Sequence, residues 1–105
     1  FSCEAKRVEG DNQMLEIIEF KNIIYPTILI DNEKQTLLYV YSEHGTKWEN
    51  NFNIIERNEN NLVGIMELRA DWVQLIHFNL NKKEFSIMYL GDVGETLTFG
   101  KCYGN

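Results

Sequence analysis

Hydrophobic and polar residues alternate along much of this chain with a period of two, the pattern of β-strands. The clearest stretch is residues 72–90, where two runs rich in aromatic and aliphatic residues flank a short polar break at 81–83. A helix would need apolar residues three and four apart with a charged stripe between them, and no such stripe occurs here. The stretch therefore predicts a long β-hairpin, with Asn81 suited to a tight turn because Asn tolerates left-handed backbone. With a period of two, one face of the first arm carries Trp72, Gln74, Ile76, Phe78 and Leu80, and one face of the second arm carries Phe85, Ile87 and Tyr89.

Two more hairpins are predicted on the same grounds, over residues 27–41 and residues 52–68. In the first, Asp31 and Asn32 are typical turn residues, because their side chains can bond their own backbone. In the second, Gly64 lies in the middle of a strand, where a bulge or a close backbone approach is common.

The ends of the chain are also expected to be extended. Residues 3–8 fit an edge strand and residues 96–102 a last strand. Residues 14–20 fit either a strand or a short helix, because Ile and Phe favour the strand while the glutamates leave the helix open. Turns are expected at 69–71 and 91–94, on either side of the central hairpin.

We therefore predict that residues 1–105 form a single all-β domain. It would be an antiparallel meander of about seven or eight strands that closes into a small barrel or a two-sheet sandwich, since a small sheet must hide its edges. Strands such as 37–41 and 72–78 are apolar on both faces. The second face would be covered by the N-terminal segment, by another copy of the chain, or by a ligand or target protein.

The composition and net charge of the chain limit the classes of partner that it could bind. The chain is 44% hydrophobic and 25% charged, as in ordinary globular domains, and its formal net charge is -6. Nucleic acid and anionic membrane surfaces are disfavoured, because affinity for phosphates comes from clustered Lys and Arg. No stretch is long and apolar enough for a membrane span. The acidity favours solubility, or else a basic partner.

The two cysteines, Cys3 and Cys102, lie almost at the two ends of the chain. A disulfide between them would tie down ends that otherwise fray, and it would imply a periplasmic or secreted protein. The first residue is Phe rather than Met, which fits a cleaved leader or a trimmed chain. The alternative is two free thiols in a cytosolic protein.

The sequence carries no catalytic signature, so we expect no enzyme and no cofactor. With the cysteines paired, His44 and His77 are too few for a zinc site, so no metal is expected. His77 is expected to be half-buried and bonded to a neighbour, and Ser86 could face it across the central hairpin without an oxyanion hole. A solvated face is expected for the carboxylates Glu56, Glu59 and Glu67.

The polar stretch 42–48 is the predicted binding loop, because binding residues commonly lie on loops held by a rigid sheet. Trp48 has the large amphipathic surface found at binding hot spots, although it could instead fold back as a plug at one end of the barrel. The candidate binding residues are Ser42, His44, Lys47, Trp48, Tyr39 and Tyr41.

The whole pattern resembles a group of small exported bacterial β proteins of unknown function with one terminal disulfide. The residues that carry the resemblance are Phe1 and Cys3 at the start, the stretches ILIDNEKQTL and IHFNLNKKEFSIMYLG, and Gly100 and Cys102 at the end. The resemblance implies an exported β domain and no particular activity.

Residues 42–48 also resemble a loop of the periplasmic inhibitors of C-type lysozyme, small antiparallel barrels with a terminal disulfide. That loop reads S-G-S-G-A-K-Y in the family, and it is matched here at Ser42, Gly45 and Lys47, with Trp48 in place of the tyrosine. Glu43 and His44 replace small residues, and the family's following W-x-K-G segment is absent. The sequence thus predicts a small exported, non-catalytic binding domain; the alternatives are a lysozyme inhibitor and a self-associating structural protein.

Overall fold

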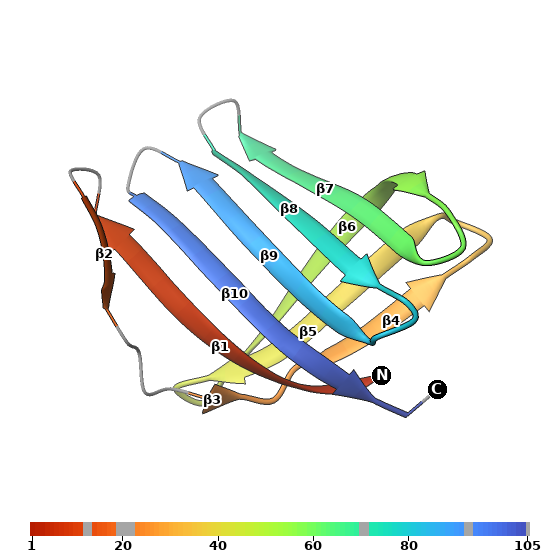
Figure 1. Cartoon of the computed structure of the whole chain (residues 1–105), viewed down its shortest axis with the longest axis horizontal. Coiled ribbons are helices and arrows are strands. Elements are labelled where there is room, and N and C mark those ends of the chain that lie inside the picture. Colours follow the sequence, from red (N-terminus) through yellow and green to blue (C-terminus); the bar gives the residue numbers. More distant parts are fainter. Residues whose placement is uncertain (12–13, 19–22, 70–71, 92–93, 105) are drawn as a thin grey trace.

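A computed structural model describes residues 1–11, 14–18, 23–69, 72–91 and 94–104 of the chain. Over these residues the secondary structure consists of ten strands and their turns, so the all-β prediction is confirmed (Figure 1). The strands are β1 (Ser2–Asp11), β2 (Met14–Ile18), β3 (Ile23–Ile24), β4 (Thr27–Asp31), β5 (Thr36–Glu43), β6 (Thr46–Arg57), β7 (Asn61–Arg69), β8 (Trp72–Asn79), β9 (Glu84–Gly91) and β10 (Gly94–Tyr103).

Eight of these described strands close an antiparallel barrel. From β4 to β10 each strand pairs with the next one along the chain, and the ring is completed by β1, which pairs with β10 on one side and with β4 on the other. The two short strands β2 and β3 also pair with β1. The predicted meander is confirmed, and the open choice between barrel and sandwich is decided for the barrel.

Side chains at the strand ends fix the three predicted hairpins. The carboxylate of Asp31 accepts backbone N–H groups two and three residues later, at 3.0 and 3.1 Å. Asn58 and Asn79 bond their own loops in the same way. In the central turn the left-handed residue is Lys83 (φ 56°), so the expectation for Asn81 is wrong. The turn itself spans residues 80–83, where the polar break predicted it, and the Asn79 side chain holds the first part of that loop, so the left-handed position falls at its last residue.

The N-terminal strand is not an edge strand, contrary to the prediction. Strand β1 pairs with β10 from Ser2 opposite Tyr103 to Gly10 opposite Glu95, so it is one of the strands that form the barrel wall. Its main partner is more than 80 residues away in sequence, so local patterning could not reveal the pairing. Residues 14–18 form a strand rather than a helix. The rest of that prediction, residues 19–20, and the expected turn residues 70–71 and 92–93 lie outside the described residues.

The two ends of the chain are joined as predicted. Cys3 lies directly opposite Cys102 in the β1–β10 pairing, and the two form a disulfide across 99 residues of sequence. Both cysteines are buried. The amino group of Phe1 donates a hydrogen bond to the carbonyl oxygen of Ile28 at 2.8 Å. The backbone N–H of Cys3 donates one to the carbonyl oxygen of Pro26, also at 2.8 Å. The first residues are therefore held on both sides.

The hydrophobic core fills the half of the barrel nearest this disulfide. Its fully buried residues include Ile28, Leu37, Phe52, Leu62, Ile76 and Phe78. Gly64 permits the close approach that its position predicted, because a Cβ there would lie 3.0 Å from both Phe52 and Ile76. A register shift occurs on the facing strand, between Ile54 and Glu56.

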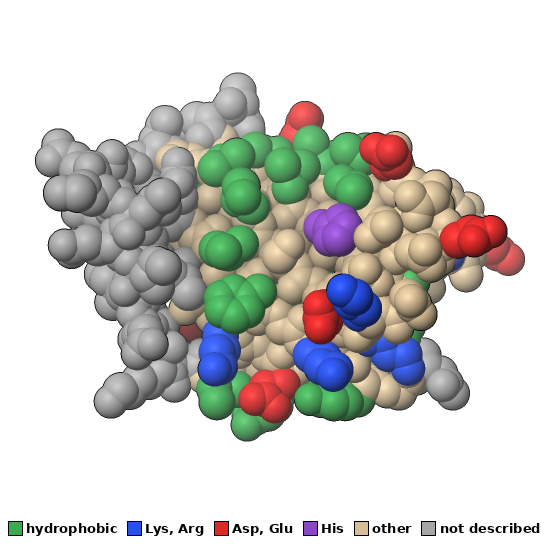
Figure 2. Space-filling view, viewed as in Figure 1, with side chains coloured by type: hydrophobic (Ala, Val, Ile, Leu, Met, Phe, Trp, Pro, Cys, Tyr) green, Lys and Arg blue, Asp and Glu red, His purple; other side chains and the backbone are tan. Residues whose placement is uncertain are grey.

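The outer face of β7 to β10 carries an apolar row. Ile65, Leu75, Met88 and Leu97 lie side by side across the four strands, and Met88 and Leu97 are exposed. Hydrophobic side chains gather over these strands on the face shown in Figure 2. The N-terminal segment was predicted to cover the second apolar face of these strands. That prediction is wrong for the residues of β1, because β1 is itself a strand of the barrel wall. Cover by another copy or by a target stays a prediction.

We predict that replacing both cysteines, Cys3→Ala with Cys102→Ala, lowers the free energy of unfolding by about 4–5 kcal/mol, because the cross-link restricts a loop of about 100 residues in the unfolded chain. Urea denaturation of the two proteins would measure this difference. Adding a reductant should move the unfolding midpoint of the wild type toward that of the variant and leave the variant unchanged. Equal midpoints for the wild type and the variant would contradict the prediction.

Candidate functional site

The side chains that point into the barrel change from apolar to polar along its length. On β8 the inward positions are Phe78 and Ile76, followed by Gln74; on β9 they are Phe85 and Ile87, followed by Tyr89. Because Gln74 and Tyr89 are paired in register, the change occurs at the same level on both strands. The interior thus has an apolar half near the termini and a polar half away from them.

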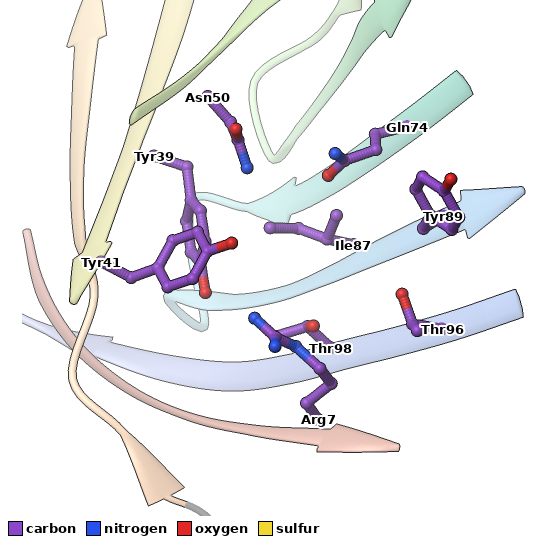
Figure 3. Close-up of a pocket in the computed structure, with 9 residues that line it drawn as sticks. All are labelled: Arg7, Tyr39, Tyr41, Asn50, Gln74, Ile87, Tyr89, Thr96 and Thr98. Carbon is purple, nitrogen blue, oxygen red and sulfur yellow. The ribbon is translucent and has the colours of Figure 1, made fainter. Parts of the chain in front are cut away.

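A cavity of about 240 Å³ occupies this polar half of the barrel. We call this cavity the polar chamber. Side chains from six strands line it, and they are drawn in Figure 3. Its lining consists of Arg7 from β1, Tyr39 and Tyr41 from β5, Asn50 from β6, Gln74 from β8, Ile87 and Tyr89 from β9, and Thr96 and Thr98 from β10. Most of these groups carry a hydroxyl or an amide, which can both donate and accept hydrogen bonds.

The charged group in this lining is held by an ion pair. Nη1 of Arg7 lies 2.9 and 3.2 Å from the two carboxylate oxygens of Glu43, and the guanidinium carbon lies 5.4 Å from the centre of the Tyr41 ring. Burial acts to lower the pKa of Arg7, but the hydrogen bond and the charge of Glu43 outweigh it, so the pKa is raised. The pairing of β4 with β5 ends at Val40, so the ion pair joins β1 to β5 beyond the reach of β4.

The hydroxyl of Tyr39 is the most unusual group in the chamber. The residue is only 2% exposed, and its hydroxyl oxygen is buried with no hydrogen-bond partner among the described residues. Burial raises the pKa of this phenol, because the charged form would lose its hydration. Leaving such a group unsatisfied costs about 1–3 kcal/mol. The chamber thus contains a polar group that the described protein does not satisfy.

Aromatic rings stand on two sides of the chamber. Tyr39 and Tyr41 pack against each other with ring centres 5.4 Å apart. Tyr89 stands across the chamber from them (Figure 3). Its ring packs edge-on against that of Trp72, with ring centres 5.5 Å apart. These contacts hold the rings in fixed positions around the polar groups.

The predicted binding loop 42–48 is largely a continuation of strands β5 and β6. Its turn is tight, with His44 (φ 51°) and Gly45 (φ 76°) both left-handed. Trp48 is 50% exposed beside Tyr41 and does not plug the barrel. A second hollow of about 280 Å³ lies here and shares Tyr41 with the chamber; its other lining residues are Glu43, His44, Thr46 and Trp48. The stretch is polar because this hairpin extends past the last pairing of β4.

The six candidate binding residues divide into three groups. Tyr39 and Tyr41 line the polar chamber, and His44 and Trp48 line the hollow beside it. Ser42 and Lys47 are paired on the opposite face of the hairpin and are exposed. Sequence reasoning missed Arg7, Asn50, Gln74, Tyr89, Thr96 and Thr98 as site residues. One signal in the sequence could have indicated a polar interior: Gln74 lies on the same strand face as Ile76 and Phe78.

The remaining candidates for chemistry lie outside the chamber. His77 stands opposite Ser86 as predicted, and its Nε2 lies 3.0 Å from the amide oxygen of Asn61. It is exposed rather than half-buried, because its strand position faces outward. The carboxylates Glu56, Glu59 and Glu67 are exposed, as predicted. The described residues contain no group of three or more His, Cys, Asp or Glu side chains that could hold a metal ion.

Comparison with known proteins finds no family model, no curated protein and no solved structure that matches this chain.

We predict that Tyr39→Phe raises the free energy of unfolding by about 1 kcal/mol near neutral pH, because it removes a buried hydroxyl without a partner. It should also reduce the loss of stability in alkali. The folded-state pKa of Tyr39 is raised. The folded protein therefore holds this proton more tightly than the unfolded chain does, so the free energy of unfolding does not depend on this group below the unfolded pKa of about 10 and falls as the pH rises from there toward the folded pKa.

Urea denaturation of the wild type and Tyr39→Phe at a series of pH values from neutral to about 11 would measure both effects. Tyr103→Phe is the matched control, since Tyr103 is 56% exposed on the outside. A Tyr39→Phe variant that is less stable than wild type at neutral pH would show that the hydroxyl is satisfied.

Proposed function

We propose that this protein is a non-catalytic binding domain that takes a small polar molecule into the polar chamber. The observation that carries the proposal is the buried hydroxyl of Tyr39, a residue that lines the chamber, which has no hydrogen-bond partner among the described residues. A bound molecule that reaches this hydroxyl would satisfy it. The side-chain amides of Asn50 and Gln74 line the same space.

The frame around the chamber suits binding. Its lining comes from paired strands, so the polar groups are fixed before a ligand arrives and little entropy is lost on binding. The side chains of Arg7 and Glu43 are 23% and 27% exposed, so this part of the site is reachable from solvent. A volume of about 240 Å³ lies a little below the usual range of about 300–1,000 Å³ for ligand pockets, which favours a small ligand.

The compartment is part of the proposal. The disulfide fits an oxidising environment. We propose the periplasm or the extracellular space as the place where the domain works. No helix in the described part of the chain is long and apolar enough to cross a membrane.

The binding proposal is tested by a thermal-shift screen of small polar compounds: sugars, amino acids, carboxylates and polyols. A true ligand at 100 times its Kd should stabilise the protein by about 2.7 kcal/mol. Asn50→Leu and Gln74→Leu remove chamber amides with little change in size, and each should reduce that stabilisation to about 1.4 kcal/mol at the same ligand concentration, as expected for tenfold weaker binding. Asn51→Leu is the matched control, because Asn51 is the adjacent residue and points outward.

Two results would count against the proposal. One is a complete library without any stabilising compound. The other is stabilisation that survives both chamber variants unchanged, which would place the site elsewhere.

The exposed hairpin 41–48 favours a second candidate, inhibition of a C-type lysozyme. The hairpin projects past β4 and presents Lys47 with a 65% exposed side chain and Trp48 with 50% exposure. Lys47, Ser42 and Gly45 match the inhibitor loop, and Trp48 stands at the position of its tyrosine. A net charge of -6 would also speed encounter with a basic enzyme.

For this candidate we predict that the protein slows cell-wall hydrolysis by a C-type lysozyme at about equimolar concentration. Lys47→Ala and Trp48→Ala should relieve the inhibition, since truncating a hot-spot residue costs 2 kcal/mol or more, about thirtyfold in affinity. Lys34→Ala, which changes the same charge on another exposed turn, should not. Full lysozyme activity at a tenfold excess of the protein would exclude this candidate.

A further inference from the structure

We infer that the ligand of the polar chamber is an uncharged, polyhydroxylated ring, which is the chemistry of a neutral carbohydrate. This inference rests on the proposed function, because it names the class of molecule that the same chamber would bind. Three features of the chamber carry it: its charge balance, the mixed hydrogen-bonding character of its lining, and the aromatic rings on two sides.

The charge balance disfavours an ionic ligand. Arg7 is the one cation in the described lining, and its charge is matched by Glu43 at 2.9 Å. An anionic ligand would have to displace the Glu43 carboxylate, and a cationic ligand would have to displace the guanidinium. Separating a partly buried pair leaves one charge without its partner, which is strongly unfavourable. A neutral ligand can bind with the pair intact.

The hydrogen-bonding groups match hydroxyls. The amides of Asn50 and Gln74 each carry two donor hydrogens and an acceptor oxygen, and the hydroxyls of Tyr39, Thr96 and Thr98 can both donate and accept. Sugar hydroxyls have the same dual character. A ligand with only acceptors, or only donors, would leave about half of this lining unpaired.

The aromatic rings match the remaining surface of such a ligand. A sugar ring has faces of C–H groups between its hydroxyls, and these faces pack on the apolar body of an aromatic side chain while the polar edge reaches its hydrogen-bond partners. Tyr41 and Tyr89 stand on two sides of the chamber, as Figure 3 shows. Trp48 extends the aromatic surface outward through the hollow that shares Tyr41. One ring would fit in the chamber, and a second could lie against Trp48.

The test is a titration of the whole protein, labelled with ¹⁵N, followed by NMR. The probes are glucose, galactose, mannose and N-acetylglucosamine, with glucuronate and acetate as charged comparisons. The side-chain amide signals of Asn50 and Gln74 report directly on the chamber. Those of Asn51 and Asn53, which are exposed on the outer face, serve as internal controls.

We expect saturable binding of at least one neutral sugar, with a Kd in the millimolar range or tighter, as suits a ligand of this size. The chamber amides should shift while the outer amides do not. Gln74→Leu and Asn50→Leu should each weaken binding about tenfold, the loss expected for one hydrogen bond. Their folding is checked by the unchanged backbone signals of β7 and β10.

The other outcomes overturn the inference in distinguishable ways. Shifts of the chamber amides with glucuronate or acetate but with no neutral sugar would refute the ligand class and support the chamber as a binding site. Sugar-induced shifts confined to outer residues would refute the location. If none of the probes shifts the chamber amides, the carbohydrate assignment fails, and the thermal-shift screen decides separately whether the chamber binds anything else.

Discussion

The structure depends on the pairing of β1 with β10, which turns a meander into a barrel. Every other long pairing joins strands that follow one another in sequence, whereas this one joins the two ends of the chain. Its register places Cys3 against Cys102, so the disulfide fixes the alignment that closes the ring. The same register places Arg7 opposite Thr98, which brings the guanidinium into the interior. A shift of one residue would turn Arg7 outward and remove the charge from the chamber.

The division of the interior into an apolar and a polar half follows from this frame. Each strand keeps its period of two across the change, so inward residues stay inward while their chemistry changes. Ile76 and Ile87 mark the boundary, with Phe78 and Phe85 on one side and Gln74 on the other. The apolar half supplies the burial that stabilises the fold. The polar half supplies little of it, and the Tyr39 hydroxyl works against stability.

The fold could be predicted from the sequence further than the site could. Local alternation revealed the three hairpins, because their strands pair across short turns. It could not place β1, whose partner lies at the other end of the chain. The site was found only at Tyr39 and Tyr41, since polar inward residues such as Asn50 look like solvent-facing ones until the barrel is closed. Glu43 and Arg7 are 36 residues apart, and the local sequence around either residue does not predict their ion pair.

The terminal disulfide and the polar chamber are connected through stability. A domain of this length buries only about 60–70% of its unfolded surface, so a single core stabilises it modestly. Here part of the interior is occupied by amides, hydroxyls and an ion pair instead of apolar side chains. The cross-link contributes about 4–5 kcal/mol in the chain-entropy model, against a typical total of about 5–15 kcal/mol. A contribution of that size offsets the burial energy that is lost when polar side chains replace apolar ones in the interior. The disulfide between Cys3 and Cys102 therefore allows this small barrel to contain a polar chamber and remain stable.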